Sequence, residues 1–523
     1  MSPASPTIEN GRGSENLRGS TASPTAQVTL RFRLVVLWIL VSAFNYGYGI
    51  SELNPLQPIL TCQQRDPHAP EKMLTLSPLK TGCIPLTESQ FGLATSLFTL
   101  GGLVSSFMVS PVSKWLGWGR KRSIFWSAVS GVLGSALLAC ASDLWSIGLG
   151  RFIQGVGSGI GVVMVPIYLN EISPVSIQGS IGVLNQLSIV IGVFVAQALG
   201  GSPLGSSGSS WRFIPLASAV LSLTQLAGAF ILAVESPGWL EGEGASAAPS
   251  ANSRQTADEI RALLWSPKAL QGHKDSQRRA TSSTTGQDEE RTGLLADQDG
   301  PVEGTSPDAA SRISHNRKAG LTDLFTDPEI RPGAILVALT QLGQQLSGIN
   351  AVLYYSVGIM GSILPSLAGS IGIMITFINI LMTFPPIYLI DEHRLGRKKL
   401  IISSALVMSF ASFLLGVGII GGYKALSATS MILMTAAFSF GLGPVPFVVL
   451  PELVPARAVS TTTSLGLTLN WTANFLVGSA FLPFKNWVSQ FDAQHTGGAA
   501  FWIFTIFNLL IAVLMGRMYN YSR

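Results

Sequence analysis

Long apolar stretches separated by short polar segments make up most of this chain. A helix needs about 20 mostly apolar residues to cross a hydrocarbon core of roughly 30 Å, and it satisfies its own backbone hydrogen bonds there. Twelve stretches meet this requirement, at residues 34–57, 90–112, 122–141, 146–169, 180–200, 211–234, 332–358, 366–390, 399–420, 428–450, 460–482 and 499–517. The pattern therefore predicts an all-α membrane protein with twelve transmembrane helices.

Two polar blocks interrupt this pattern. Residues 1–30 are rich in Ser, Thr, Pro and Gly, and we expect a disordered tail because so little apolar surface cannot offset the entropy of ordering. Residues 236–325 form a mostly disordered central loop, in which TADEIRALLW predicts a short amphipathic helix. The loop separates two six-helix bundles, at 31–235 and 326–517, and a short tail follows at 518–523.

Composition and charge support a membrane protein. Hydrophobic residues make up 47% of the chain and charged residues only 12%, about half the charged fraction of a soluble domain. The net charge of +5 does not indicate nucleic-acid binding, because the basic residues cluster beside hydrophobic runs, where they set topology. We expect both termini and the central loop on the cytoplasmic side, and loop 58–89 on the other.

The three cysteines are few for a chain of this length. Cys62 and Cys83 share loop 58–89, so a disulfide between them is plausible, and it would contribute roughly 3 kcal/mol by closing the loop. Two free surface thiols are the alternative. With five scattered histidines and no CxxC, the sequence predicts neither a metal site nor a cofactor.

Short motifs repeat between the two halves. GRK at Gly119–Lys121 recurs 277 residues later at Gly396–Lys398, and ExxP at Glu171 recurs 281 residues later at Glu452. Near-equal offsets indicate duplication. Two six-helix repeats with a cytoplasmic connection are typical of a transporter whose binding site lies at midplane between the bundles.

The run QQLSGINAVLYYS, from Gln344 to Ser356, places carboxamides inside an apolar span. An unpaired amide in hydrocarbon costs roughly 2–7 kcal/mol, so Gln344, Gln345 and Asn350 should face the bundle interior or a hydrated cavity. A cavity lined by amides suits a ligand with many hydroxyl groups.

These residues resemble the sugar porter family of the major facilitator superfamily over nearly all of residues 34–517. The stretch from Gly150 to Gln197 is similar to the family's fourth and fifth helices, and QQLSGINAVLYYS is similar to the hallmark of its seventh. GLGPVPFVVLPEL and NWTANF resemble the tenth and eleventh helices. The resemblance implies the major facilitator fold, with twelve helices in two six-helix pseudo-repeats, and a carrier that is not an enzyme.

The resemblance also implies which residues contact sugar. Carboxamides both donate and accept hydrogen bonds, as hydroxyl groups do, and aromatic faces pack on sugar C–H groups. The matching positions are Gln186, Gln344, Gln345, Asn350, Asn379, Phe447, Trp471 and Asn474, with Tyr354 and Tyr355 as outer-gate aromatics. Phe447 stands where the family usually has Trp. For any single Gln or Asn, a helix-to-helix hydrogen bond is the alternative.

Charged residues at the cytoplasmic ends match a family latch that pairs across the bundles when that side is closed. The candidates are Arg120, Glu171, Arg397, Glu452 and Arg457. Two departures from the family pattern change its surroundings, because Gln178 and Gly238 stand where Arg is usual. Charges that only set topology are the alternative.

Proton-coupled relatives carry an Asp in the first helix near an Arg in the fourth. The Arg matches Arg151, but the Asp position aligns with Gly49, which favours a facilitator. Glu52, one turn further along, could still exchange a proton beside Arg151. A fixed ion pair between helices would account for the same two residues.

The leading hypothesis is transport of a monosaccharide, a hexose such as glucose, by alternating access through a monomer in the bilayer. A transporter of another polyol such as inositol, and a sugar receptor with a transporter fold, are the alternatives.

Within the central loop, Glu290, Leu294 and Leu295 of DEERTGLL resemble an acidic dileucine signal read by sorting adaptors. This favours the vacuolar membrane over the plasma membrane, and an ordinary solvated linker is the competing interpretation.

Overall fold

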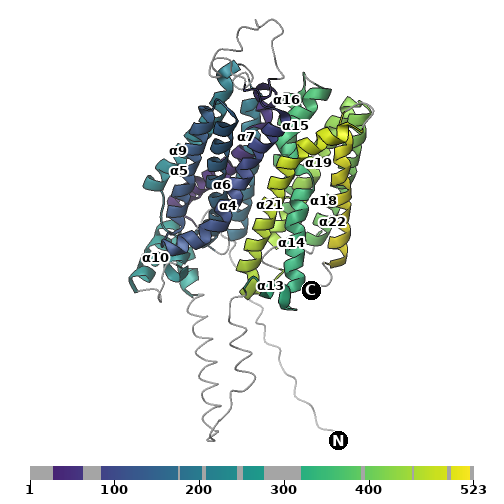
Figure 1. The fold of residues 1–523 in the computed structure, drawn as a ribbon. Helices are drawn as coiled ribbons and strands as arrows, with labels where there is room; N and C mark the ends of the chain where they lie inside the picture. The colour runs from purple at the N-terminus through teal and green to yellow at the C-terminus, as the bar shows by residue number, and fades with distance from the viewer. Residues whose placement is uncertain are drawn as a thin grey trace, which may run out of the picture.

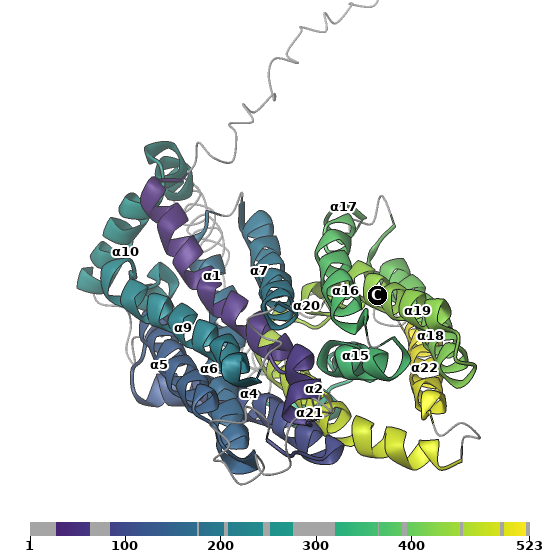
Figure 2. The same cartoon turned by 90° about the horizontal axis from the view of Figure 1, so that it is seen from above.

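The computed structural model describes residues 28–62, 84–174, 177–202, 208–243, 251–275, 320–364, 366–389, 395–449, 453–491 and 496–518. Helices account for most of these residues, and a single β-bridge joins Val28 to Trp265. The helices form two groups that stand side by side (Figures 1 and 2). We call residues 28–243 the N-terminal half and residues 320–518 the C-terminal half.

The N-terminal half contains six long helices with similar apolar character. They are α1 (Leu30–Ser51), α4 (Glu88–Trp115), α5 (Arg120–Ala139), α6 (Leu144–Ile172), α7 (Gln178–Gly200) and α9 (Phe213–Ile231). Helix α6 packs against both α4 and α5. Glycines permit this close approach, since a Cβ on Gly101 would overlap the Phe152 carbonyl and one on Gly155 would overlap the Phe98 carbonyl.

The C-terminal half is less regular, because three of its six predicted spans are broken. The intact helices are α18 (Arg397–Ile420), α21 (Ala456–Ser489) and α22 (Trp502–Met518). The broken spans are α14 (Arg331–Leu346) with α15 (Ile349–Ile363), α16 (Ala368–Met382) with α17 (Pro385–Leu389), and α19 (Lys424–Phe440) with α20 (Val445–Val449).

The breaks explain part of the difference between twelve predicted spans and the helices that are long and apolar enough on their own. In the part of the chain that the structure describes, eight helical segments are both long and apolar enough to cross a membrane. The apolar helices at 184–200 and 368–382 are shorter, as are α14 and α15, which share one span. Helix α21 has 34 residues but many Thr and Asn side chains. Together these segments still make six crossings in each half.

The sharpest break lies at Gly348, between α14 and α15. Gly348 has a φ of 88°, in the left-handed region that favours glycine. A Cβ there would lie 2.5 Å from the Phe504 ring. The side chain of Asn508 donates to the freed carbonyl of Ser347 at 3.0 Å. Glycine is therefore required by both backbone conformation and space.

The central loop contributes a helix that packs against the N-terminal half. Helix α10 (Ala251–Leu264) is followed by Trp265, whose Nε1 donates to the Ile172 carbonyl at 2.7 Å. Thr29 caps the start of α1 and donates through Oγ1 to the Leu264 carbonyl at 3.0 Å. Helix α10 thereby ties the start of α1 to the end of α6.

The two halves meet mainly near one end of the molecule. We call the end where α5 and α18 begin, with Arg120 and Arg397, the basic end, and the opposite end the far end. Helix α4 packs along α21 and α7 along α16. A Cβ on Gly92 of α4 would contact Tyr355, and one on Gly372 of α16 would contact Gln197. These contacts lie toward the far end.

We expect Gly348→Ala to lower stability by roughly 1–3 kcal/mol, because Ala is strained at positive φ and its Cβ meets Phe504. Thermal unfolding in detergent would measure this as a lower transition temperature. Gly361→Ala in α15, where a Cβ meets nothing within 4 Å, is the control and should be neutral or slightly stabilising. Equal effects of the two substitutions would contradict this explanation of the break.

Candidate functional site

Buried carboxamides gather where α14 and α15 separate. Gln345 Nε2 donates to Asn470 Oδ1 of α21 at 2.9 Å and to Gln344 Oε1 at 3.2 Å. Asn350 Nδ2 donates to Gln345 Oε1. Asn470 Nδ2 donates to Gln344 Oε1 at 2.7 Å and to Gln341 Oε1 at 2.9 Å. We call these five residues, Gln341, Gln344, Gln345, Asn350 and Asn470, the carboxamide cluster.

Two members of the cluster, Gln341 and Asn470, were not among the residues that the sequence pointed to. Gln341 lies about one helical turn before Gln344 and Gln345, so it shares their face of α14. Asn470 lies one turn before Asn474, next to Trp471, so helical spacing could have indicated it. The cluster buries all five side chains to an exposure of 7% or less.

Gln344 also has a second, structural set of contacts. Its Nε2 donates to the carbonyls of Leu442 at 3.0 Å and Gly443 at 2.7 Å. Both carbonyls lie in the break between α19 and α20, where helical partners are missing. Gln344 therefore joins one broken span to another, and its role in sugar contact stays a prediction.

Aromatic side chains lie on the far-end side of the cluster. Tyr354 OH donates to Asn474 Oδ1 at 2.8 Å, and Tyr355 OH donates to the Gly478 carbonyl. Both tyrosines are almost fully buried. Trp471 is 2% exposed, and its ring centroid lies 5.8 Å from that of Tyr46 in α1. Tyr354, Tyr355 and Trp471 thus bring aromatic surface to the seam between the halves.

The other predicted sugar contacts do not join the cluster directly. Asn379 of α16 accepts a hydrogen bond from Ser439 Oγ at 2.6 Å. Gln186 of α7 is half-buried and has no hydrogen bond to any residue in the described ranges. Phe447 of α20 is 44% exposed. Their roles in sugar binding stay predictions.

The charged residues at the basic end form ion pairs within each half. Arg120 donates to Glu171 through Nη2 at 2.9 Å and through Nε at 3.2 Å. Arg457 pairs with Asp327 at 3.0 Å and with Glu329 at 2.6 Å. Arg120 and Glu171 both belong to the N-terminal half, and Arg457, Asp327 and Glu329 belong to the C-terminal half. Pairing across the halves in another conformation stays a prediction.

Glycines in the motifs of the N-terminal half shape the surroundings of Arg120. A Cβ on Gly119 would overlap the Glu235 carboxylate, and one on Gly238 would press on the Glu171 side chain. Glu235 accepts from the N–H of Lys121 at 3.3 Å, and burial raises the pKa of its carboxyl above the ordinary value. The Glu171 carboxylate also accepts from Ser236 Oγ, so Arg120 and Ser236 share it.

Glu52 and Arg151 form a fully enclosed ion pair. Arg151 Nη1 lies 3.2 Å from Glu52 Oε2, and both side chains are 0% exposed. Gln154 Nε2 donates to the same oxygen at 2.8 Å, and Arg151 Nη1 donates to Gln154 Oε1 at 2.8 Å. Arg151 also stacks over the ring of Phe98, with 4.4 Å to the centroid. A Cβ on Gly49 would meet that same ring.

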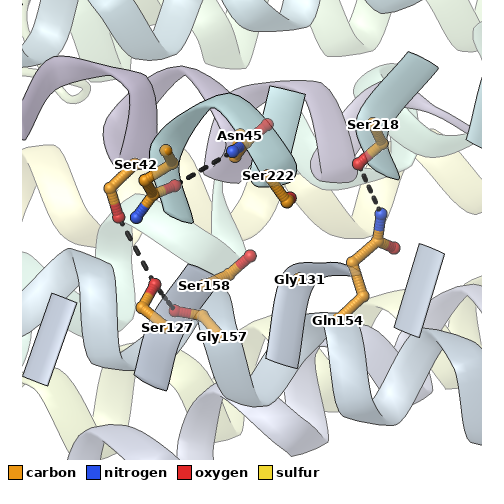
Figure 3. A pocket seen from close by; sticks show the side chains of 10 residues that line it. Ser42, Asn45, Ser127, Gly131, Gln154, Gly157, Ser158, Ser218 and Ser222 are labelled. Atoms are coloured by element: carbon orange, nitrogen blue, oxygen red, sulfur yellow. Dashed lines mark hydrogen bonds between the residues drawn. The ribbon is translucent and has the colours of Figure 1, made fainter. Parts of the chain in front are cut away.

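A small polar cavity lies beside this pair, inside the N-terminal half (Figure 3). Its volume is about 10 Å³, roughly the space of one water molecule. Its walls come from α1, α5, α6 and α9, and include Asn45, Ser127, Gln154, Ser222 and Gln225. It is too small for a sugar and lies apart from the carboxamide cluster.

Some predicted residues lie outside the described ranges. These are Cys83, Glu452, Glu290, Leu294 and Leu295. Cys62 is disulfide-bonded, and Cys140 is a free thiol; the pairing of Cys62 with Cys83 stays a prediction. Among the described residues, no group of three or more His, Cys, Asp or Glu side chains could hold a metal ion.

Comparison with known proteins places this architecture in a family. The model of the family described as "Sugar (and other) transporter" matches residues 34–519. A probable metabolite transport protein of Saccharomyces cerevisiae is 30% identical over 84% of this chain and 84% of its own length. The human facilitated glucose transporter member 4 is 27% identical over 92% of this chain and 86% of its own length.

A solved structure shares the fold. The proton:xylose symporter XylE of E. coli, bound to 6-bromo-6-deoxy-D-glucose, superposes with a TM-score of 0.65 at 20% identity. The match covers 93% of this chain and 95% of that one. The chain therefore belongs to the sugar transporter family and has the major facilitator fold. It is a multi-pass membrane transporter and not an enzyme, as the sequence predicted.

Proposed function

We propose that this protein moves a hexose, with glucose as the first candidate, across a membrane by alternating access. The carboxamide cluster carries this proposal. It lies at a helix break in the middle of a predicted span, beside the seam between the halves, where transporters of this type bind substrate. Facilitated glucose transport by a relative that covers most of this chain supports the same class of substrate.

The cluster is chemically suited to a neutral sugar. Its amides now bond to one another, so each can exchange a protein partner for a sugar hydroxyl without losing a hydrogen bond. Gln345 is the central member, because it donates to Asn470 and Gln344 and accepts from Asn350. The cluster contains no charged group, which disfavours ionic substrates.

The arrangement of contacts supports a carrier closed at the far end. On that side Tyr355 of α15 packs against Phe91 of α4 across the seam, with 6.3 Å between the ring centroids. Sugar would reach the carboxamide cluster from the basic end in this conformation. Rocking of one half against the other would then present the same cluster to the far side.

The enclosed pair of Glu52 and Arg151 supports facilitation without proton coupling. Two opposite charges held together with no exposed surface stabilise each other, and removing one partner from such a pair costs several kcal/mol. A carboxylate held in this way by Arg151 and Gln154 favours a fixed ion pair between α1 and α6. The pair then fixes how α1 and α6 face each other and is not a titrating switch.

Gln345→Ala should raise the KM for glucose about tenfold, because two hydrogen bonds from one carboxamide contribute roughly 1–3 kcal/mol. Counterflow of labelled glucose in proteoliposomes would measure this. Gln225→Ala is the matched control, because Gln225 is equally buried but bonds to Asn45 in the N-terminal half. An unchanged KM in Gln345→Ala would argue against the cluster as the sugar site.

A facilitator brings internal sugar only to the external concentration, whatever the pH gradient. We therefore expect labelled glucose in proteoliposomes to reach the same plateau with and without an inward proton gradient. Accumulation above the external concentration that a protonophore abolishes would show coupling instead. Fructose and inositol as competitors would define the substrate, and stronger inhibition by inositol than by glucose would favour a polyol carrier.

We propose the vacuolar membrane as the site of action, on the strength of the acidic dileucine pattern in the central loop. Replacing Leu294 and Leu295 together by Ala should move a fluorescent fusion from the vacuolar membrane to the plasma membrane, because adaptors would no longer select it. Replacing Leu263 and Leu270, which lie outside the pattern, is the control. Unchanged vacuolar fluorescence in the Leu294 and Leu295 variant would contradict this proposal.

A further inference from the structure

The far end of the seam contains a buried polar contact that the carboxamide cluster does not include. Asn54 follows α1, where the chain turns into the short 3-10 helix η2 (Asn54–Leu56). Its side chain is 2% exposed. Asn54 Nδ2 donates to Ser356 Oγ of α15 at 2.8 Å, and its Oδ1 accepts from the Val357 N–H at 3.1 Å. One carboxamide of the N-terminal half thus bonds twice to one turn of α15.

The same carboxamide is held in place from its own half. Asn54 Nδ2 also donates to Gln197 Oε1 of α7 at 3.1 Å, and Ser51 Oγ donates to that oxygen at 3.2 Å. Gln197 is fully buried and lies against Gly372 of α16. Asn54 is therefore oriented by α1 and α7 before it reaches α15.

Two other amides at this seam are incompletely bonded. Gln197 Nε2 and Gln57 Oε1 are buried and have no hydrogen-bond partner among the described residues. Gln57 lies against Gly358 of α15. A buried amide atom without a hydrogen-bond partner raises the free energy of the closed state. Water that reached the atom on opening would remove this cost. These two atoms favour opening of the far end, whereas the two bonds from Asn54 to α15 oppose it.

We propose that Asn54 is the clasp that holds the far end closed, and that opening begins when its bonds to Ser356 and Val357 are exchanged for water. The inference rests on the alternating access proposed above. It assigns Asn54 a positioning role in the conformational step, without contact to sugar. A balance between two satisfied bonds and two unsatisfied atoms keeps the closed and open states close in free energy.

Asparagine suits this role because its carboxamide donates and accepts at once. Aspartate could accept from Val357 but could not donate to Ser356, and its charge would face Gln197 Oε1. Alanine would remove both bonds to α15. It would also leave Ser356 Oγ without its donor in the closed state, which adds to the tendency to open.

The test measures opening of the far end by the reactivity of a buried cysteine. Ser96 of α4 is 0% exposed and lies across the seam from Gly478 of α21. In full-length protein carrying Cys140→Ser and Ser96→Cys, a maleimide reacts only when the halves separate there. We expect Asn54→Ala to raise the labelling rate about tenfold, since it removes two buried hydrogen bonds that favour closure.

Two controls separate opening from general loosening. Ser51→Ala removes a bond to the same Gln197 oxygen but none to α15, so labelling of Ser96→Cys should stay within about twofold. The second control is another reporter, Ser412→Cys, in the interior of the C-terminal half, where Ser412 is 0% exposed. Its labelling should be equally slow with and without Asn54→Ala. Faster labelling at both reporters would indicate a purely structural role and overturn the proposal.

Ser356→Ala provides an independent variant, because it removes a single bond from the α15 side and should raise Ser96→Cys labelling about threefold. This variant tests the clasp if Asn54→Ala does not yield folded protein. Labelling equal to that of Ser51→Ala would overturn the clasp. The readout needs no sugar, so a clasp that opens as expected in a protein without glucose uptake would sink the proposed function and leave this inference standing.

Discussion

Lipid offers no hydrogen-bond partner, so the polar side chains in the bilayer-spanning part of this protein lie inside it, where they can bond to one another. This constraint accounts for the carboxamide cluster, the Glu52–Arg151 pair and the Asn54 contact alike. Each is a set of buried groups that would be costly alone and become tolerable together. The apolar surface of the helices fixes where the chain lies, and these polar sets fix how the helices face one another.

The broken helices follow from the same constraint. A break frees backbone carbonyls that need donors, and the carboxamides supply them: Asn508 reaches Ser347 at the first break, and Gln344 reaches Leu442 and Gly443 at another. Two of the three breaks in the C-terminal half therefore lie beside amides that bond to their carbonyls. The result is a polar region in the interior of the C-terminal half.

The two halves differ in the regularity of their helices and in the polar groups that they contain. The N-terminal half is regular and closely packed through glycines, and its buried charges are neutralised within it. The C-terminal half has the breaks, the cluster and the aromatic residues near the seam.

Much of this protein could be predicted from its sequence. Apolar length and the recurring GRK and ExxP motifs determined the membrane class and the two-fold architecture, because both depend on local composition and repetition. QQLSGIN identified three members of the carboxamide cluster, since amides in an apolar span are conspicuous. The sequence also suggested that Glu52 and Arg151 form an ion pair.

Only the tertiary structure decided which amides meet. Gln341 and Asn470 joined the cluster because α14 and α21 pack face to face, whereas Gln186, on a helix of the other half, did not bond to it. Asn54 bonds to Ser356 because η2 lies against α15, some 300 residues away in sequence. A hydrogen bond depends on two atoms being within about 3 Å. The pattern of residues along one helix does not show which residue of another helix will lie opposite it.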